Sequence, residues 1–166
     1  MLETKYLQDN VQNIKKLMTI PSLQKFETKH LKRLLKLSKI REYEHDECII
    51  KEGMKDRWLY FLLVGKVSVR KGDTEITIID KMGEIFGEMQ IIDRQSRSAS
   101  VFAQGKTICL AVDISATDRL IATDERANFL LMLYRMFVEF ISVRLRLTNE
   151  ELIKYKKEVQ KVSEDH

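Results

Sequence analysis

Two residues whose charges and spacing could recognise a ligand, Glu88 and Arg97, stand nine positions apart in the stretch GEIFGEMQIIDRQSRSASV, residues 83–101. Gly87 precedes the acid, and a glycine lets the backbone come close to a bound molecule. Residues 89–92 are largely apolar and predict a helix start, whose free N–H groups favour an anion. The planar fork of arginine suits a phosphate. These residues therefore predict a binding site for a molecule that carries both a negative charge and a hydroxyl.

A cyclic nucleotide combines these two groups. Its phosphate would bind the guanidinium of Arg97 and the free N–H groups, and the 2′-hydroxyl of its ribose would donate to the Glu88 carboxylate. A buried charge without a partner is strongly disfavoured, so the pair favours a ligand that completes it. The sequence offers no nucleophile with an adjacent base and no general acid-base couple, so we expect recognition and not catalysis.

This stretch resembles the phosphate-binding cassette of the cyclic nucleotide-binding domain family, which reads FGE, then apolar residues, then R-[AST]-A. Phe86-Gly87-Glu88 and Arg97-Ser98-Ala99 match the cassette at the family's usual spacing. The resemblance implies that the ribose lies against Gly87 and Glu88. It implies that the phosphate lies against Arg97, Ser98, Ala99, Met89 and Gln90, mostly through backbone groups.

Gln90 departs from the family pattern, which usually has alanine or another small residue at this position. Only the backbone N–H is required there, so the longer side chain could either crowd the phosphate or point to solvent. The alternative to a binding site is a domain that has kept its cassette as scaffold and has lost its ligand.

The composition limits the other classes of function. The chain has 166 residues and a formal net charge of +4, and its basic residues are dispersed among nearly as many acids, which is typical of a solvated surface. Cys48 and Cys109 stand singly in apolar segments and the histidines lack ligand spacing, so we expect core thiols and no metal. The N-terminus has no signal pattern and no apolar run approaches about twenty residues, so we expect a cytoplasmic protein.

Three segments should position the site in an α+β protein, which we expect to be an antiparallel β jelly-roll barrel with N-terminal helices and a long C-terminal helix. Residues 1–38 form the helical lead-in, in which a second helix is capped by Thr28 and buries leucines. Residues 39–115 consist of short β-branched and aromatic runs with glycines between them, which indicates the barrel. Residues 116–166 return to a helical pattern. The first helix, over residues 3–18, has the stripe Leu7, Val11, Ile14 and Met18.

The C-terminal helix is expected over residues 126–162, which contain neither glycine nor proline. At a rise of about 1.5 Å per residue it would be about 55 Å long. A narrow apolar seam favours a homodimeric coiled coil through this helix, whereas the alternative is a helix folded back on its own barrel. The seam recurs at alternating spacings of three and four and consists of Leu131, Tyr134, Val138, Ile141, Leu145, Thr148, Leu152, Tyr155, Val159 and Val162.

Thr148 is the polar member of this seam, and Asn149 follows it. Residues 144–150 resemble the R-L-x-x-T-[ST]-E segment in the dimer helix of the catabolite activator branch of the family, whose polar residues reach the adenine. The resemblance implies that Thr148 and Asn149 contact the base and favour cAMP, with cGMP possible. That branch continues into a helix-turn-helix domain and this sequence does not, so we expect no direct DNA binding.

Two functions are compatible with these patterns. The first is a stand-alone cyclic nucleotide receptor, most favourably for cAMP, that signals through its C-terminal helix to a downstream protein that the sequence does not identify. The second is a structural or adaptor module whose cassette no longer binds a cyclic nucleotide and whose coiled coil binds a protein. Stabilisation by the ligand separates the two, because only the first predicts it.

Overall fold

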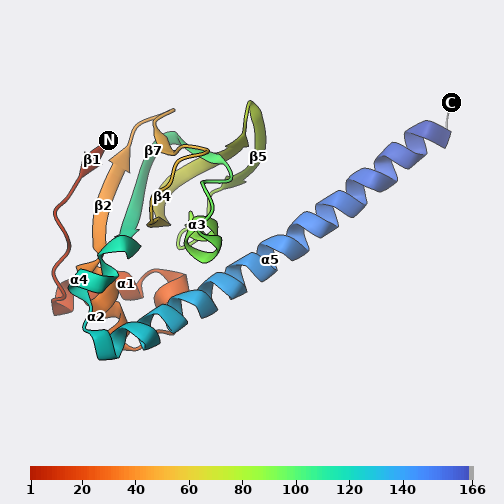
Figure 1. Cartoon of the computed structure of the whole chain (residues 1–166). Helices are drawn as coiled ribbons and strands as arrows, with labels where there is room; N and C mark the ends of the chain where they lie inside the picture. Colours follow the sequence, from red (N-terminus) through yellow and green to blue (C-terminus); the bar gives the residue numbers. More distant parts are fainter. Residues whose placement is uncertain (165–166) are drawn as a thin grey trace. The chain divides into compact units, whose positions relative to one another are not determined.

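The computed structural model describes residues 1–164. The chain divides into two compact units, the first from Met1 to Leu131 and the second from Met132 onward. The first unit holds the strands and the short helices, and the second holds most of the long helix α5 (Thr123–Glu164) (Figure 1). None of the helices in the described part of the chain is long and apolar enough to cross a membrane.

Antiparallel strands form one sheet in the first unit, with the order β1-β2-β7-β4-β5, while β3 pairs with β7 and β6 pairs with β4. The fold class expected from the sequence is confirmed. One detail differs, because the strands follow an open path and do not close into a barrel. The seven strands are β1 (Leu2–Glu3), β2 (Ser38–Tyr43), β3 (Cys48–Ile50), β4 (Trp58–Lys71), β5 (Thr74–Ile79), β6 (Ile85–Phe86) and β7 (Ser100–Asp113).

The two longest strands, β4 and β7, pair along most of their length and form the centre of the sheet. At Gly65 in β4 the backbone has a φ of +85°, and an added Cβ would lie 2.4 Å from the Lys106 carbonyl oxygen, so only glycine fits this close approach. Phe86, at the end of β6, belongs to the core and is the first residue of the predicted cassette, so the core fixes where the cassette begins. The core cluster consists of Tyr43, Ile50, Tyr60, Leu62, Val67, Ile79, Phe86, Val101, Ala103, Cys109 and Ala111.

The two cysteines differ in burial, although both were predicted to be core thiols. Cys109 is fully buried in β7, as expected. Cys48 is exposed, so the prediction was wrong for this residue. The pairing of β3 with β7 shifts register between Cys48 and Ile50. Because of this irregularity, Cys48 does not share the buried face of the strand with Ile50.

The N-terminal segment is partly strand, and the predicted helix over residues 3–18 was too long. Strand β1 pairs with β2, and helix α1 (Val11–Met18) begins only after Asn10, whose side chain accepts a hydrogen bond from the first turn and caps it. Ile14 and Leu17 are the buried residues of α1, whereas Val11 and Met18 are exposed. The predicted apolar stripe was therefore wrong at Val11 and Met18, because the capped helix turns a different face to the core.

Helix α2 (Thr28–Lys36) follows the short helix η1 (Pro21–Leu23) and packs on α1. Thr28 is the first helical residue and not the cap, because Glu27 takes the extended N-cap conformation without a side-chain hydrogen bond. The leucines predicted to be buried in this helix are in the core, namely Leu31, Leu34 and Leu35.

Helix α5 follows the short helices η2 (Ile114–Ala116) and α4 (Thr117–Leu120) and extends beyond the predicted range of 126–162 at both ends. Along α5, most of the apolar seam residues are exposed in the single chain. These are Leu131, Tyr134, Val138, Leu145, Leu152, Tyr155, Val159 and Val162.

Candidate functional site

The cassette begins where β6 runs into the short helix α3 (Glu88–Asp93) through Gly87. This glycine caps α3 with a φ of 86°, in the left-handed region that side chains avoid. A Cβ at this position would lie 2.8 Å from Nη1 of Arg97 and 3.0 Å from the carbonyl oxygen of Trp58. Glycine is therefore required both by the backbone conformation and by the close approach of the arginine.

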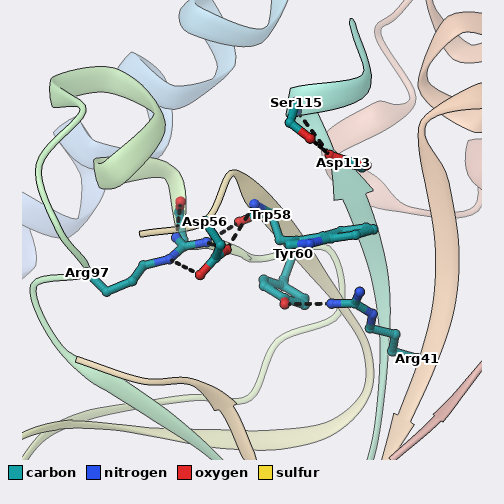
Figure 2. A network of polar contacts seen from close by, with 8 residues as sticks. Arg41, Asp56, Trp58, Tyr60, Arg97, Asp113 and Ser115 are labelled. Carbon is teal, nitrogen blue, oxygen red and sulfur yellow. Dashed lines mark hydrogen bonds and ion pairs between the residues drawn. The ribbon is translucent and has the colours of Figure 1, made fainter. Parts of the chain in front are cut away.

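Arg97 is buried, with 4% of its surface exposed, and three residues hold its guanidinium (Figure 2). Nη1 donates to the Gly87 carbonyl at 2.7 Å, and Nη2 donates to the Trp58 carbonyl at 2.6 Å. Nε and Nη2 donate to the two carboxylate oxygens of Asp56 at 3.3 and 2.5 Å. The arginine that the sequence assigns to a phosphate is therefore fixed beside the start of the cassette helix.

Asp56 is the counter-ion of Arg97, and sequence reasoning missed it. Burial alone would raise the pKa of the Asp56 carboxyl, but the hydrogen bonds and the charge of Arg97 outweigh burial and hold this pKa below its ordinary value. The two residues are 41 positions apart, so no spacing rule could reveal the pair. The signal in the sequence was weak, an acid just before the apolar run of β4.

Replacing Asp56 with asparagine should destabilise the ligand-free protein by about 1–2 kcal/mol. This loss is smaller than that expected for a fully buried ion pair, because solvent screens the partly exposed carboxylate. The Asp56 side chain is 38% exposed. Since the folded pKa lies below the ordinary value of 3.8, this contribution is complete above pH 3.8 and is lost as the pH falls through the folded value. Urea unfolding of the parent and the variant at neutral and acidic pH measures the difference. Equal stabilities at neutral pH would contradict the role of this pair.

A second arginine, Arg41, lies against aromatic residues beside the cassette (Figure 2). Its guanidinium lies 3.8 Å from the centre of the Trp58 ring, and its Nη1 donates to the Tyr60 hydroxyl at 2.9 Å. Tyr60 in turn stacks on Phe86, with ring centres 5.1 Å apart. Trp58 thus contacts both arginines, since its carbonyl accepts from Arg97 and its ring lies against Arg41. These contacts support the cassette from the side of β4.

The other predicted phosphate and ribose residues lie on α3 and on the segment that follows Arg97. Ser98 and Met89 are exposed and meet, since the Ser98 hydroxyl donates to the Met89 sulfur at 3.6 Å. Glu88 and Gln90 are buried, with 5% and 8% of their surfaces exposed. Ala99 is half-buried. The cassette therefore places buried polar residues next to exposed ones, which is an arrangement suited to a small polar ligand.

Thr148 and Asn149 lie on α5, in the second unit, and both are exposed. The cassette residues belong to the first unit. The contact of these two residues with a base therefore stays a prediction.

Comparison with known proteins gives the family. A family model described as cyclic nucleotide-binding domain matches residues 40–124. The cAMP-dependent protein kinase type II regulatory subunit of Drosophila melanogaster is 37% identical over 86 residues, which cover 49% of this chain and 22% of that protein. The cGMP-dependent protein kinase of Eimeria tenella is 29% identical over 90 residues, which cover 54% of this chain and 9% of that protein. The matched stretch is thus less than a quarter of either relative.

Solved structures show the same fold. A cyclic nucleotide-binding domain from Methylobacillus flagellatus has a TM-score of 0.66 to this chain at 22% identity, and the match covers 81% of this chain and 79% of that one. At this level of identity the likeness concerns the fold alone.

Proposed function

This chain belongs to the cyclic nucleotide-binding domain family, and from that premise we propose that it is a stand-alone receptor for a cyclic nucleotide, with cAMP as the preferred ligand. The observation that carries the proposal is Arg97, a buried guanidinium held 2.7 Å from the Gly87 carbonyl at the start of the cassette helix. The proposed activity is binding and not catalysis, and the proposed location is the cytoplasm.

In the proposed complex, the cyclic phosphate binds Arg97 and the backbone of residues 89, 90, 98 and 99. The ribose lies against Gly87, and its 2′-hydroxyl donates to the Glu88 carboxylate. Charge-assisted hydrogen bonds of this kind are about twice as strong as neutral ones, so these two residues supply most of the affinity. Binding shifts the population of conformations of α5, which passes the signal to a downstream protein.

Thermal unfolding tests this proposal. At a concentration of a hundred times its dissociation constant, a ligand that binds only the folded state adds about 2.7 kcal/mol of stability. We expect cAMP to raise the melting temperature of the ligand-free protein by several degrees. The absence of a shift with both cAMP and cGMP would contradict the receptor and favour the second candidate.

The second candidate is an adaptor module whose cassette binds no nucleotide and which acts through α5. A specific observation favours it: Asp56 already neutralises Arg97 without a ligand. An arginine paired in this way does not need an anion to be tolerated in the fold. The exposed apolar seam of α5 would then be the functional surface.

For the receptor we also propose a homodimer through α5. A double variant in which the seam residues Leu145 and Leu152 are both replaced by lysine should be a monomer, because buried charges oppose a coiled-coil core. The matched control replaces Val143 and Ile153 by lysine, since these two residues lie on the same helix outside the seam and are similarly exposed. Sedimentation should give a monomer for the seam variant and a dimer for the control. A parent protein that sediments as a monomer would contradict the dimer.

The preference for adenine is proposed to come from Thr148 and Asn149. A hydroxyl and an amide carbonyl can accept from the exocyclic amine of adenine, a donor that guanine lacks at that edge. Replacing both residues with alanine should weaken cAMP binding by about 1–3 kcal/mol and cGMP binding hardly at all. Calorimetric titration of the variant and the parent with each nucleotide measures this difference. Equal losses for the two nucleotides would mean that these residues do not read the base.

A further inference from the structure

A cavity lies between helix α1 and the sheet, in the first unit of the chain. Its volume is about 280 Å³, and its mostly apolar lining includes Leu17, Ile20, Ile40, Leu63, Met82 and Leu110. Leu110 in β7 stands between Cys109 and Ala111, which belong to the core cluster that also contains Phe86. Because successive side chains of a strand point to opposite faces, the cavity and this core cluster lie on opposite faces of the sheet.

The size of the cavity limits the molecules that it can hold. Val64 and Met82 line it and leave 53% and 46% of their surfaces exposed, so they mark its opening to solvent. Pockets for small ligands usually measure about 300–1,000 Å³, so this one is at the lower end of that range. At about 30 Å³ per carbon atom, close to the share of one water molecule in the liquid, the cavity holds about nine carbons. A single unbranched chain of about eight to ten carbons therefore fits.

The polar lining residues select the end group of such a chain. They are Asn13, Lys16 and Thr19, and no acid is among the described residues of the lining. The Asn13 amide donates to the Gln8 carbonyl at 2.8 Å, and the Thr19 hydroxyl donates to a carbonyl of α1 at 2.7 Å. Within residues 1–164, the ammonium of Lys16 takes part in no ion pair or hydrogen bond. Lys16 is exposed, as expected when a lysine stem covers apolar surface and its ammonium stays in water, so an anionic head group complements the opening.

We propose that this cavity binds a medium-chain fatty acid, with its chain between α1 and the sheet and its carboxylate beside Lys16. Removal of the chain from water supplies most of the affinity, because the lining is apolar. The lysine fixes the direction in which the chain enters. This site goes beyond the proposed function and does not depend on it, because the cassette residues are not part of the lining.

Calorimetric titration of the purified protein with hexanoate, octanoate, decanoate and dodecanoate tests the fit of the chain. Up to decanoate, each added methylene should tighten binding about fourfold, which is the effect of burying one more CH₂ group. Dodecanoate should bind about as tightly as decanoate, because its last carbons extend beyond the cavity. Affinity that keeps rising by the same factor from decanoate to dodecanoate would overturn the inference. So would the absence of saturable decanoate binding up to about 1 mM, the range of weak affinities.

The Lys16→Glu variant tests the position of the carboxylate. It should bind decanoate about tenfold more weakly than the parent, because a surface attraction is replaced by a repulsion of similar size. Lys15→Glu is the matched control, because Lys15 is exposed beside it in α1 and does not line the cavity, and it should bind like the parent. The neutral 1-decanol should bind equally to the parent and to Lys16→Glu. Equal losses of decanoate affinity in the two lysine variants would overturn the inference.

The Val64→Trp variant tests whether the cavity itself holds the chain. A larger side chain at the opening should weaken decanoate binding at least about tenfold, because it takes up space that the ligand needs. Ile76→Trp is the control, because Ile76 is similarly exposed on β5 and does not line the cavity. Equal affinities of the two tryptophan variants would contradict the site. Sedimentation of Met82→Lys tests the other occupant, since a parent that associates and a variant that does not would place a second copy at the opening and overturn the inference.

Discussion

Replacing Arg97 with alanine should weaken cyclic nucleotide binding by about 3–5 kcal/mol, a loss of at least about a hundredfold. The variant removes the only buried cation of the cassette, and with it the charge-assisted bonds to the phosphate. Arg94→Ala is the matched control, because Arg94 is exposed at the end of α3 and has no assigned role. Titration calorimetry of both variants measures the effect.

The same substitution should also lower the stability of the ligand-free protein, because Arg97 donates to two backbone carbonyls and to Asp56. Each of these acceptors would lose a donor, although Asp56 would still accept from the Trp58 backbone N–H. Binding should therefore be measured at a temperature well below the melting point of the variant. A folded Arg97→Ala protein that binds as tightly as the parent would show that the phosphate lies elsewhere.

Replacing Gly87 with alanine should destabilise the protein by about 2–4 kcal/mol and remove ligand binding. The destabilisation is the sum of the cost of a left-handed backbone conformation and the cost of a steric clash. The clash arises because the new Cβ would lie 2.8 Å from Nη1 of Arg97 and 3.0 Å from the Trp58 carbonyl oxygen. Neither partner can move without breaking the bonds that hold the guanidinium.

Gly105→Ala separates the two causes. Gly105 also has a positive φ, of +75°, but nothing lies within 4 Å of a Cβ added there. This control should lose only the backbone penalty, about 1–2 kcal/mol, and should keep ligand binding. Urea unfolding and a cAMP titration of the two variants provide the comparison. Equal destabilisation by the two substitutions would contradict the steric role of Gly87.

The local parts of the site could be predicted from the sequence, because they depend on neighbours in the chain. Phe86, Gly87 and Glu88 are consecutive, and their order alone indicates a strand that turns through a glycine into a helix. The buried position of Arg97 was expected from its chemistry. The long C-terminal helix was also predictable, since its heptad pattern needs no tertiary information.

The remaining features depend on contacts that no local pattern encodes. Asp56 meets Arg97 because the segment before β4 is hydrogen-bonded to the Arg97 backbone, with the Gly53 N–H donating to the Arg97 carbonyl at 2.9 Å and the Arg97 N–H donating to the Met54 carbonyl at 2.8 Å. The strand β1 forms because β2 offers it an edge, which overrides the helical periodicity of the segment. The burial of Gln90 likewise depends on the packing of α3, so the sequence left its direction open.

The most direct test of the receptor is a calorimetric titration of ligand-free protein with cAMP and cGMP side by side. We expect saturable binding of one nucleotide per chain, with cAMP bound more tightly by about 1–3 kcal/mol. Absence of binding of either nucleotide up to about 1 mM, the range of weak affinities, would contradict the receptor and leave the adaptor as the function of this chain.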